Sequence, residues 1–242
     1  MSRFSALVFL SLCSVAICGI VSSYPDPELP GGLFRRVAAY DASQFDGKKV
    51  VVFSHYATCG VASTLALYMA RVGADVRVFA PAESEICTSI LADEAVKAVG
   101  GKCSSSVLDY DNYDAVLSAL KDIKETVYAI VNLPGLPFAT VLAAESAYVD
   151  GCEECKKIAH PSVLQLYNVD APPEIEDAAN TAATIGLMRN AVGHGVRANS
   201  MRIMNMKDDT EIAQVAESFL YLSADESKHV RGTMFNRHWS FY

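Results

Sequence analysis

The sequence of 242 residues lacks any cluster of lysine and arginine, and its formal net charge is −8. Proteins that bind nucleic acid gain much of their affinity from basic side chains on phosphates, so this composition argues against a nucleic-acid partner. Anionic membrane surfaces attract the same kind of basic cluster, which is also missing. Because 51% of the residues are apolar, we expect a packed globular domain rather than a disordered chain.

Cysteines are too few and too scattered for the disulfide framework of a small secreted protein. Two of the seven, Cys13 and Cys18, lie in an N-terminal apolar segment. Only Cys152 and Cys155 lie close together, and they fit a redox motif, half of a metal site, a structural disulfide or two ordinary thiols. We expect ordinary thiols and no metal, because the pair falls late in a predicted helix and only His160 is near as a further ligand.

Charged residues are also absent from Phe4–Val21, which is an apolar run. Two interpretations of residues 1–23 are open. A run of about 18 apolar residues lies near the lower limit for a transmembrane helix, and it is also typical of a secretory signal peptide, here cleaved near Ser23. We expect a retained membrane anchor, with secretion after cleavage as the alternative. Residues 24–47 then form a linker, rich in proline and glycine at its start, and a lead-in to the domain.

The domain, residues 48–242, opens with the stretch KKVVVFSHYATCGVASTLALYMARVGADVRVFAP. Val50–Phe53 is a short apolar run typical of a buried strand, and Asp75–Ala80 is typical of a second strand. Between them, apolar residues recur at helical spacing. A strand, a tight turn, a helix and a strand form a βαβ unit, which opens a dinucleotide-binding fold. The helical stripe consists of Val61, Leu65, Met69 and Val72.

Strands and helices continue to alternate toward the C-terminus without an internal repeat. This pattern predicts an α/β fold, a doubly wound parallel sheet of about seven strands with helices on both faces, preceded by one N-terminal apolar helix. Further strands are expected at Lys102–Leu108, Thr126–Val131, Ser162–Val169, Gly195–Met204 and Gly232–Tyr242. Further helices are expected at Ala82–Val99, around Val116–Ile123, and at Pro137–Lys157, Glu174–Val192 and Asp209–Leu222.

Four stretches of the domain occur in a familiar order. They are RVGADVRVF in the opening unit, VNLPG at the end of the fourth strand, GLMRN followed by GHGVRANSM, and FLYLSADESKHVRGTMF near the C-terminus. In this order and spacing they resemble the short-chain dehydrogenase/reductases over nearly the whole domain. The resemblance implies a Rossmann fold, a glycine-rich turn for NAD or NADP, and a catalytic tyrosine and lysine assisted by a serine and an asparagine.

The chain departs from the family where the family has its chemistry. Counting back from Gly186 places the family's tyrosine and lysine at Asp177 and Thr181, and Ala171–Arg189 contains neither residue type. The expected serine and asparagine are missing as well. We therefore expect no enzymatic activity and assign no catalytic residue. A replacement acid at Asp177 is the alternative to a solvated surface carboxylate.

The family's phosphate turn falls on His55–Ala62, where Gly60 alone is retained. Tyr56 takes the place of the first glycine, although the backbone there must approach the pyrophosphate closely. The second strand ends in Phe-Ala-Pro, without an acid for a ribose or an arginine for a 2′-phosphate. We therefore expect no cofactor. If NAD or NADP does bind, its contacts are expected at Gly60, Ala62, Asn132 and Gly135.

These observations predict a catalytically inactive short-chain-dehydrogenase-like protein. We expect a membrane-tethered accessory subunit, whose partners are the protein subunits of a larger membrane complex. Two alternatives are open. One is a divergent NAD(P)-dependent oxidoreductase, and the other is a soluble secreted binding protein released by signal cleavage.

Overall fold

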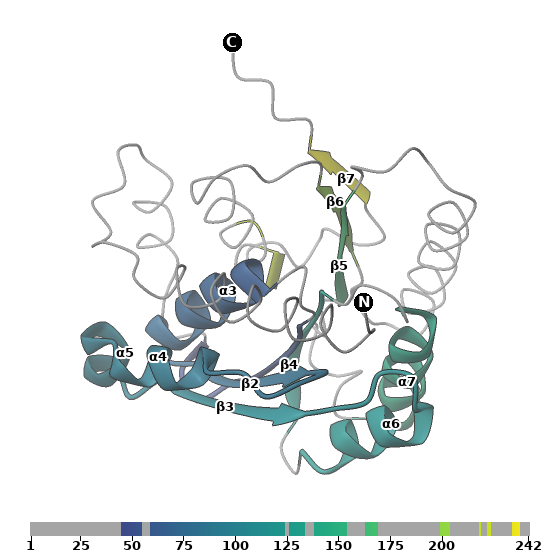
Figure 1. Cartoon of the computed structure of the whole chain (residues 1–242), viewed down its shortest axis with the longest axis horizontal. Helices are drawn as coiled ribbons and strands as arrows, with labels where there is room; N and C mark the ends of the chain where they lie inside the picture. The colour runs from purple at the N-terminus through teal and green to yellow at the C-terminus, as the bar shows by residue number, and fades with distance from the viewer. Residues whose placement is uncertain are drawn as a thin grey trace, which may run out of the picture.

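The computed structural model describes residues 45–54, 59–123, 126–133, 138–153, 163–168, 199–203, 218, 222–223 and 234–237. Within residues 49–168, strands alternate with helices, and two successive helices lie between the second and third strands (Figure 1). The strands are β1 (Lys49–Phe53), β2 (Asp75–Ala80), β3 (Lys102–Val107), β4 (Val127–Asn132), β5 (Val163–Asn168), β6 (Ser200–Ile203) and β7 (Met234–Arg237). The helices are α3 (Cys59–Arg71), α4 (Ile86–Ala92), α5 (Glu94–Val99), α6 (Tyr113–Lys121) and α7 (Phe138–Gly151).

The strands form one parallel sheet in the order β3-β2-β1-β4-β5-β6-β7. The chain builds outward from β1 to β3 and then returns to the other side of β1 with β4. This arrangement confirms the prediction of a parallel, Rossmann-like α/β sheet. The predicted N-terminal apolar helix and the predicted helices at 174–192 and, for most of its length, 209–222 lie outside the described residues. In the part of the chain that the structure describes, no helix has the length and apolar character needed to cross a membrane.

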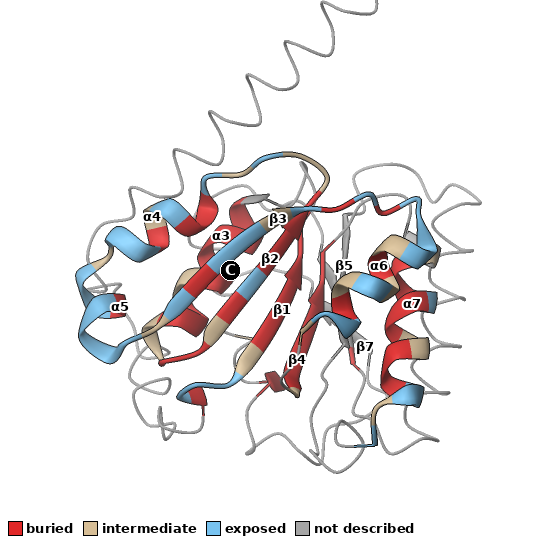
Figure 2. Ribbon diagram, turned by 90° about the horizontal axis from the view of Figure 1, so that it is seen from below, coloured by how far each residue is buried: buried red, intermediate tan, exposed pale blue. Residues whose placement is uncertain are grey.

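Helices cover both faces of the sheet (Figure 2). Successive side chains of a strand point to opposite faces, so a strand covered on both faces is apolar on both, as β1 is from Val50 to Phe53. On one face α3 buries Val61, Leu65 and Met69, three members of its predicted stripe. On the other face, α6 and α7 close a second core that includes Val51, Phe53, Val116, Leu120, Ile130 and Val141.

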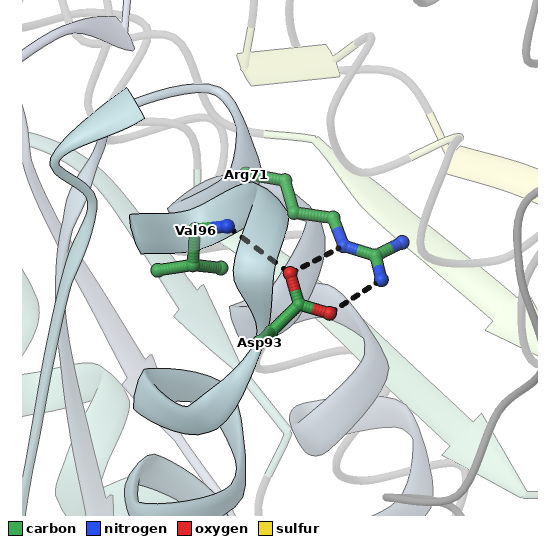
Figure 3. A network of polar contacts seen from close by, with 3 residues as sticks. All are labelled: Arg71, Asp93 and Val96. Carbon is green, nitrogen blue, oxygen red and sulfur yellow. Dashed lines mark hydrogen bonds and ion pairs between the residues drawn. The ribbon is translucent and has the colours of Figure 1, made fainter. Parts of the chain in front are cut away.

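The prediction of a single helix over Ala82–Val99 is wrong, because α4 and α5 are separated by Asp93 in an extended conformation. The Asp93 carboxylate accepts a hydrogen bond from the backbone N–H of Val96 at 3.0 Å and so caps α5. It also accepts two hydrogen bonds from the Arg71 guanidinium, at 3.2 and 2.6 Å (Figure 3). Since Arg71 ends α3, this contact ties the start of α5 to α3. Gly100 ends α5 in a left-handed conformation, at the position that the sequence predicted.

Two of the described cysteines form a disulfide that the sequence did not predict. It joins Cys87 of α4 to Cys103 of β3, and both side chains are buried. The short crossover lays α4 against β3, which brings Cα atoms 16 residues apart in the sequence to 5.1 Å. Cys152, just after α7, is also disulfide-bonded, to a partner outside the described residues. The prediction of an ordinary thiol at Cys152 is therefore wrong.

Candidate functional site at the carboxyl edge of the sheet

The candidate site lies where β1 and β4, neighbours in the sheet, both end. After β1 the chain passes to α3 on one face, and after β4 it passes to α7 on the other. Connections that diverge in this way open a crevice at the carboxyl edge of a parallel sheet, which is where open α/β sheets bind ligands. Phe53, which ends β1, is paired in register with Asn132, which ends β4.

Three of the four predicted cofactor contacts meet at this edge. Gly60 and Ala62 lie in the first turn of α3, shortly after β1, and both are buried. Asn132 is the last residue of β4 and is fully buried. Gly135, the fourth, lies outside the described residues. The fold thus brings Gly60, Ala62 and Asn132 together from stretches about 70 residues apart, as the family's topology requires.

Other predicted positions lie outside the described residues. They are Asp177 and Thr181, which occupy the family's catalytic positions, and residues 55–58 of the phosphate turn. These assignments stay predictions. What the structure adds is that α3 has no acidic residue in its first turn, so no carboxylate there offsets the positive end of the helix dipole.

Tyr110, which the sequence pattern did not single out, ties together the ends of β1 and β2. Its hydroxyl lies 2.7 Å from the carbonyl oxygen of Ser54 and 2.6 Å from that of Phe79, so one O–H is shared between two strand ends. Its ring lies edge-on to Phe53, with 5.9 Å between centroids, and Phe53 stacks on Phe79 at 5.4 Å. Burial raises the pKa of Tyr110, so its hydroxyl keeps its proton and remains a donor.

The end of β2 offers no group for a ribose. The strand ends at Ala80 with Pro81 next, as predicted, and the carboxylate that follows, Glu83, is exposed. The Ala80 carbonyl accepts a hydrogen bond from the backbone N–H of Leu108 at 2.8 Å. An acid at this strand end is what binds the ribose hydroxyls in NAD-dependent Rossmann folds. The described residues therefore do not fit the adenosine-ribose part of a dinucleotide, although Gly60 remains for its pyrophosphate.

Asn132 and Glu145 form a buried polar pair beside the crevice, between β4 and α7. Asn132 is 0% and Glu145 is 1% exposed, and the side-chain N and O atoms of both lack hydrogen-bond partners within the described residues. Burial raises the pKa of Glu145 to about 8, and the neighbouring Asn132 amide opposes that rise only in part. The sequence did carry a signal for Glu145, since it shares a helical stripe with Val141 and Tyr148 and is the only acid on it.

Two titratable side chains beside the ends of β1 and β4, Tyr110 and Glu145, are buried away from solvent, whereas Glu83 after β2 and Asp109 after β3 are exposed. A general acid must reach the atom that it protonates, and neither Tyr110 nor Glu145 has that access. Within the described ranges, no three His, Cys, Asp or Glu side chains lie together as metal ligands.

Comparison with known proteins points to one fold. No protein-family model and no curated protein matches the sequence. Among solved structures, an NADH-dependent reductase responsible for alginate metabolism matches with a TM-score of 0.65 at 13% identity, over 81% of this chain and 97% of that one. The same reductase complexed with NAD gives 0.63 at 15% identity, with the same coverage. A short-chain dehydrogenase from Mycobacterium smegmatis gives 0.62 at 19% identity, over 92% of this chain and 100% of that one. The chain therefore has the Rossmann fold of the short-chain dehydrogenase/reductases.

Proposed function

We propose that this chain is a short-chain-dehydrogenase-like protein without dehydrogenase activity, tethered by residues 1–23 as an accessory subunit of a larger membrane complex. One observation supports the loss of activity most directly: Ala171–Arg189 contains no tyrosine and no lysine. Hydride reduction of a carbonyl needs a proton donor at the oxygen, which the resembled family takes from a tyrosine assisted by a lysine. Asp177 and Thr181 stand in those places, so that pair of groups is missing.

The carboxyl edge supports a role in binding other proteins rather than in catalysis. Tyr110 donates its hydroxyl to two strand ends, which stabilises the sheet and directs the proton at buried backbone carbonyls. β2 ends without a ribose ligand. A domain that keeps its core and loses its reactive groups still presents a stable surface to partner subunits.

The disulfides support a place on the oxidising side of a membrane. Disulfides persist in the endoplasmic reticulum lumen and outside the cell, whereas cytosolic thiols stay reduced. The Cys87–Cys103 bond and the bond of Cys152 therefore favour a domain that faces such a compartment. Either interpretation of residues 1–23, an anchor or a cleaved signal, is compatible with that side.

Nucleotide binding tests the proposal directly. The full-length protein in detergent is titrated with NADH and with NADPH, while binding is followed by cofactor fluorescence and carbonyl reduction by absorbance. We expect neither saturable binding at micromolar cofactor nor turnover with any aldehyde or ketone. Tight binding together with turnover would refute the proposal. The protein extracted from its native source should also co-migrate with other subunits, and a lone monomer would argue against the accessory role.

A second candidate, a divergent NAD(P)-dependent oxidoreductase, is favoured by the first turn of α3, which lies at the crevice and carries no acid. A structural neighbour of this fold is complexed with NAD. In this case Gly60, Ala62, Asn132 and Gly135 would hold the dinucleotide, which supplies the hydride. A Gly60→Val substitution should then abolish NADH binding. The matched control is Gly151→Ala, at an exposed glycine with open space around it, and it should leave binding unchanged.

A further inference from the structure

Glu145 is a carboxylic acid placed in the core between α7 and the sheet. It is 1% exposed, and neither of its oxygens has a hydrogen-bond partner in the described part of the chain. The described residues also give it no ion pair. Burying a carboxylate without a partner is costly, so the neutral, protonated acid is the form that this position tolerates.

The direction of α7 sets what surrounds this carboxyl. The helix begins near the carboxyl edge of the sheet and runs back along β4, and helical side chains tilt toward the helix N-terminus. Glu145 therefore reaches toward Asn132, the last residue of β4, whose amide is also unpaired. Tyr110 faces the same group from the β3–α6 connection, since a charge on Glu145 would raise the pKa of the Tyr110 hydroxyl.

The remaining titratable groups nearby do not neutralise a charge at this position. Tyr148, one turn along α7, has a pKa raised by burial, and its hydroxyl oxygen is hydrogen-bonded to the backbone of Val127. The charged side chains of α6, Asp114 and Lys121, are exposed. Inside the core, an ionised Glu145 would therefore be stabilised only in part, by the Asn132 amide. Contact with water would stabilise it further, and that contact requires α7 to move away from β4.

We propose that Glu145 is a proton-controlled lock that holds α7 against the carboxyl edge of the sheet. With its proton, the acid stays in the core and α7 stays packed. Without it, the carboxylate takes up water, and α7 separates from β4 at Asn132. Because Asn132 ends β4 at the crevice, this opening would expose the edge where the candidate site lies. The lock needs no bound dinucleotide, so the experiments that test it do not depend on whether the proposed function is right.

Hydrogen exchange followed by mass spectrometry tests the lock in the full-length protein. Protection of α7 amides, corrected for the intrinsic effect of pH, is compared at pH 6 and pH 8. If the pKa of Glu145 is about 8 in the folded protein and 4.5 when the side chain is exposed, its ionisation weakens the protection of α7 amides roughly 50-fold between pH 6 and pH 8. Wild type should show that loss in α7, and Glu145→Gln should not. The control Glu83→Gln, at an exposed acid, should behave as wild type.

The lock is refuted if protection of α7 in wild type is the same at both pH values, or if Glu145→Gln loses as much as wild type. A second measurement guards against a variant that fails to fold. In wild-type protein labelled with ¹³C at glutamate, one side-chain carboxyl signal should titrate near pH 8. Ionisation of every glutamate in the ordinary range near pH 4 to 5 would overturn the proposal.

Discussion

Breaking the Cys87–Cys103 disulfide should cost the domain a measurable part of its stability. The bond joins α4 to β3 across a separation of 16 residues, and both cysteines are buried. Closing a loop of this length removes conformational entropy from the unfolded chain, which is worth about 3 kcal/mol at 25 °C. Since α4 and β3 also lie in contact along other residues, we expect a folded but less stable protein.

Urea unfolding measures that loss. For a domain of this size, a slope of about 2 kcal/mol per molar urea turns 3 kcal/mol into a midpoint shift of roughly 1.5 M. Reductant alone is an ambiguous probe, because Cys152 is also disulfide-bonded. The comparison is therefore made in a Cys152→Ala background, in which dithiothreitol should lower the midpoint by that amount. The triple variant that also carries Cys87→Ala and Cys103→Ala should start at the lower midpoint and should not respond to dithiothreitol.

Two outcomes would refute this reasoning. If dithiothreitol leaves the midpoint of the Cys152→Ala protein unchanged, the bond either does not form or contributes nothing. If the triple variant still responds to dithiothreitol, the effect comes from other thiols. An unchanged midpoint with two free thiols on Cys87 and Cys103 would also remove the main support for an oxidising compartment.

Further substitutions test the contacts around α3 and α5. Gly101→Ala would place a Cβ 2.0 Å from the backbone carbonyl oxygen of Ala70, so it should destabilise the domain by several kcal/mol in urea unfolding. The control Gly151→Ala, whose Cβ would have no atom within 4 Å, should change stability by less than about 1 kcal/mol. Asp93→Ala removes the cap of α5 and the contact with Arg71, which should cost about 1 to 2 kcal/mol at pH 7. Hydrogen bonding from Arg71 lowers the pKa of Asp93, so this contribution should be complete above the ordinary pKa of the group and be lost as pH falls through the lowered pKa of the folded state. A variant cost that does not decrease as pH is lowered from 7 into the acid range would contradict this assignment.

The sheet could be predicted from the sequence because its signals are local. The predicted strand at Asp75–Ala80 has the same first and last residues as β2. The signals for it, apolar residues within the strand and a glycine and a proline on either side, all lie within a few residues. The α4–α5 break was missed for the opposite reason. Apolar residues continue at helical spacing through Asp93, and the group that fixes its carboxylate, Arg71, lies 22 residues earlier in the chain.

Only the residues that the family resemblance identified could be named as candidate site residues from the sequence. Gly60, Ala62 and Asn132 lie at the carboxyl edge, because topology carries strand ends to one side of a parallel sheet, and their contact with a cofactor stays a prediction. Tyr110 was missed because its partner Ser54 lies 56 residues away, and nothing local marks such a contact. Glu145 was also missed, although an acidic residue on an apolar helical stripe is a signal that the sequence contains.

The groups that fix this fold and the groups that would do its chemistry are physically separate. The cores on the two faces of the sheet are built from apolar side chains that alternate along the strands, and their burial stabilises the domain whatever lies at the strand ends. Exposed residues at the carboxyl edge, such as Glu83, lie outside those cores, so they can change without unfolding the chain. Tyr110 is the opposite case, an edge residue that belongs to a core and whose hydroxyl hydrogen-bonds strand carbonyls. An intact Rossmann core is therefore evidence for the fold, and evidence for activity has to come from the edge itself.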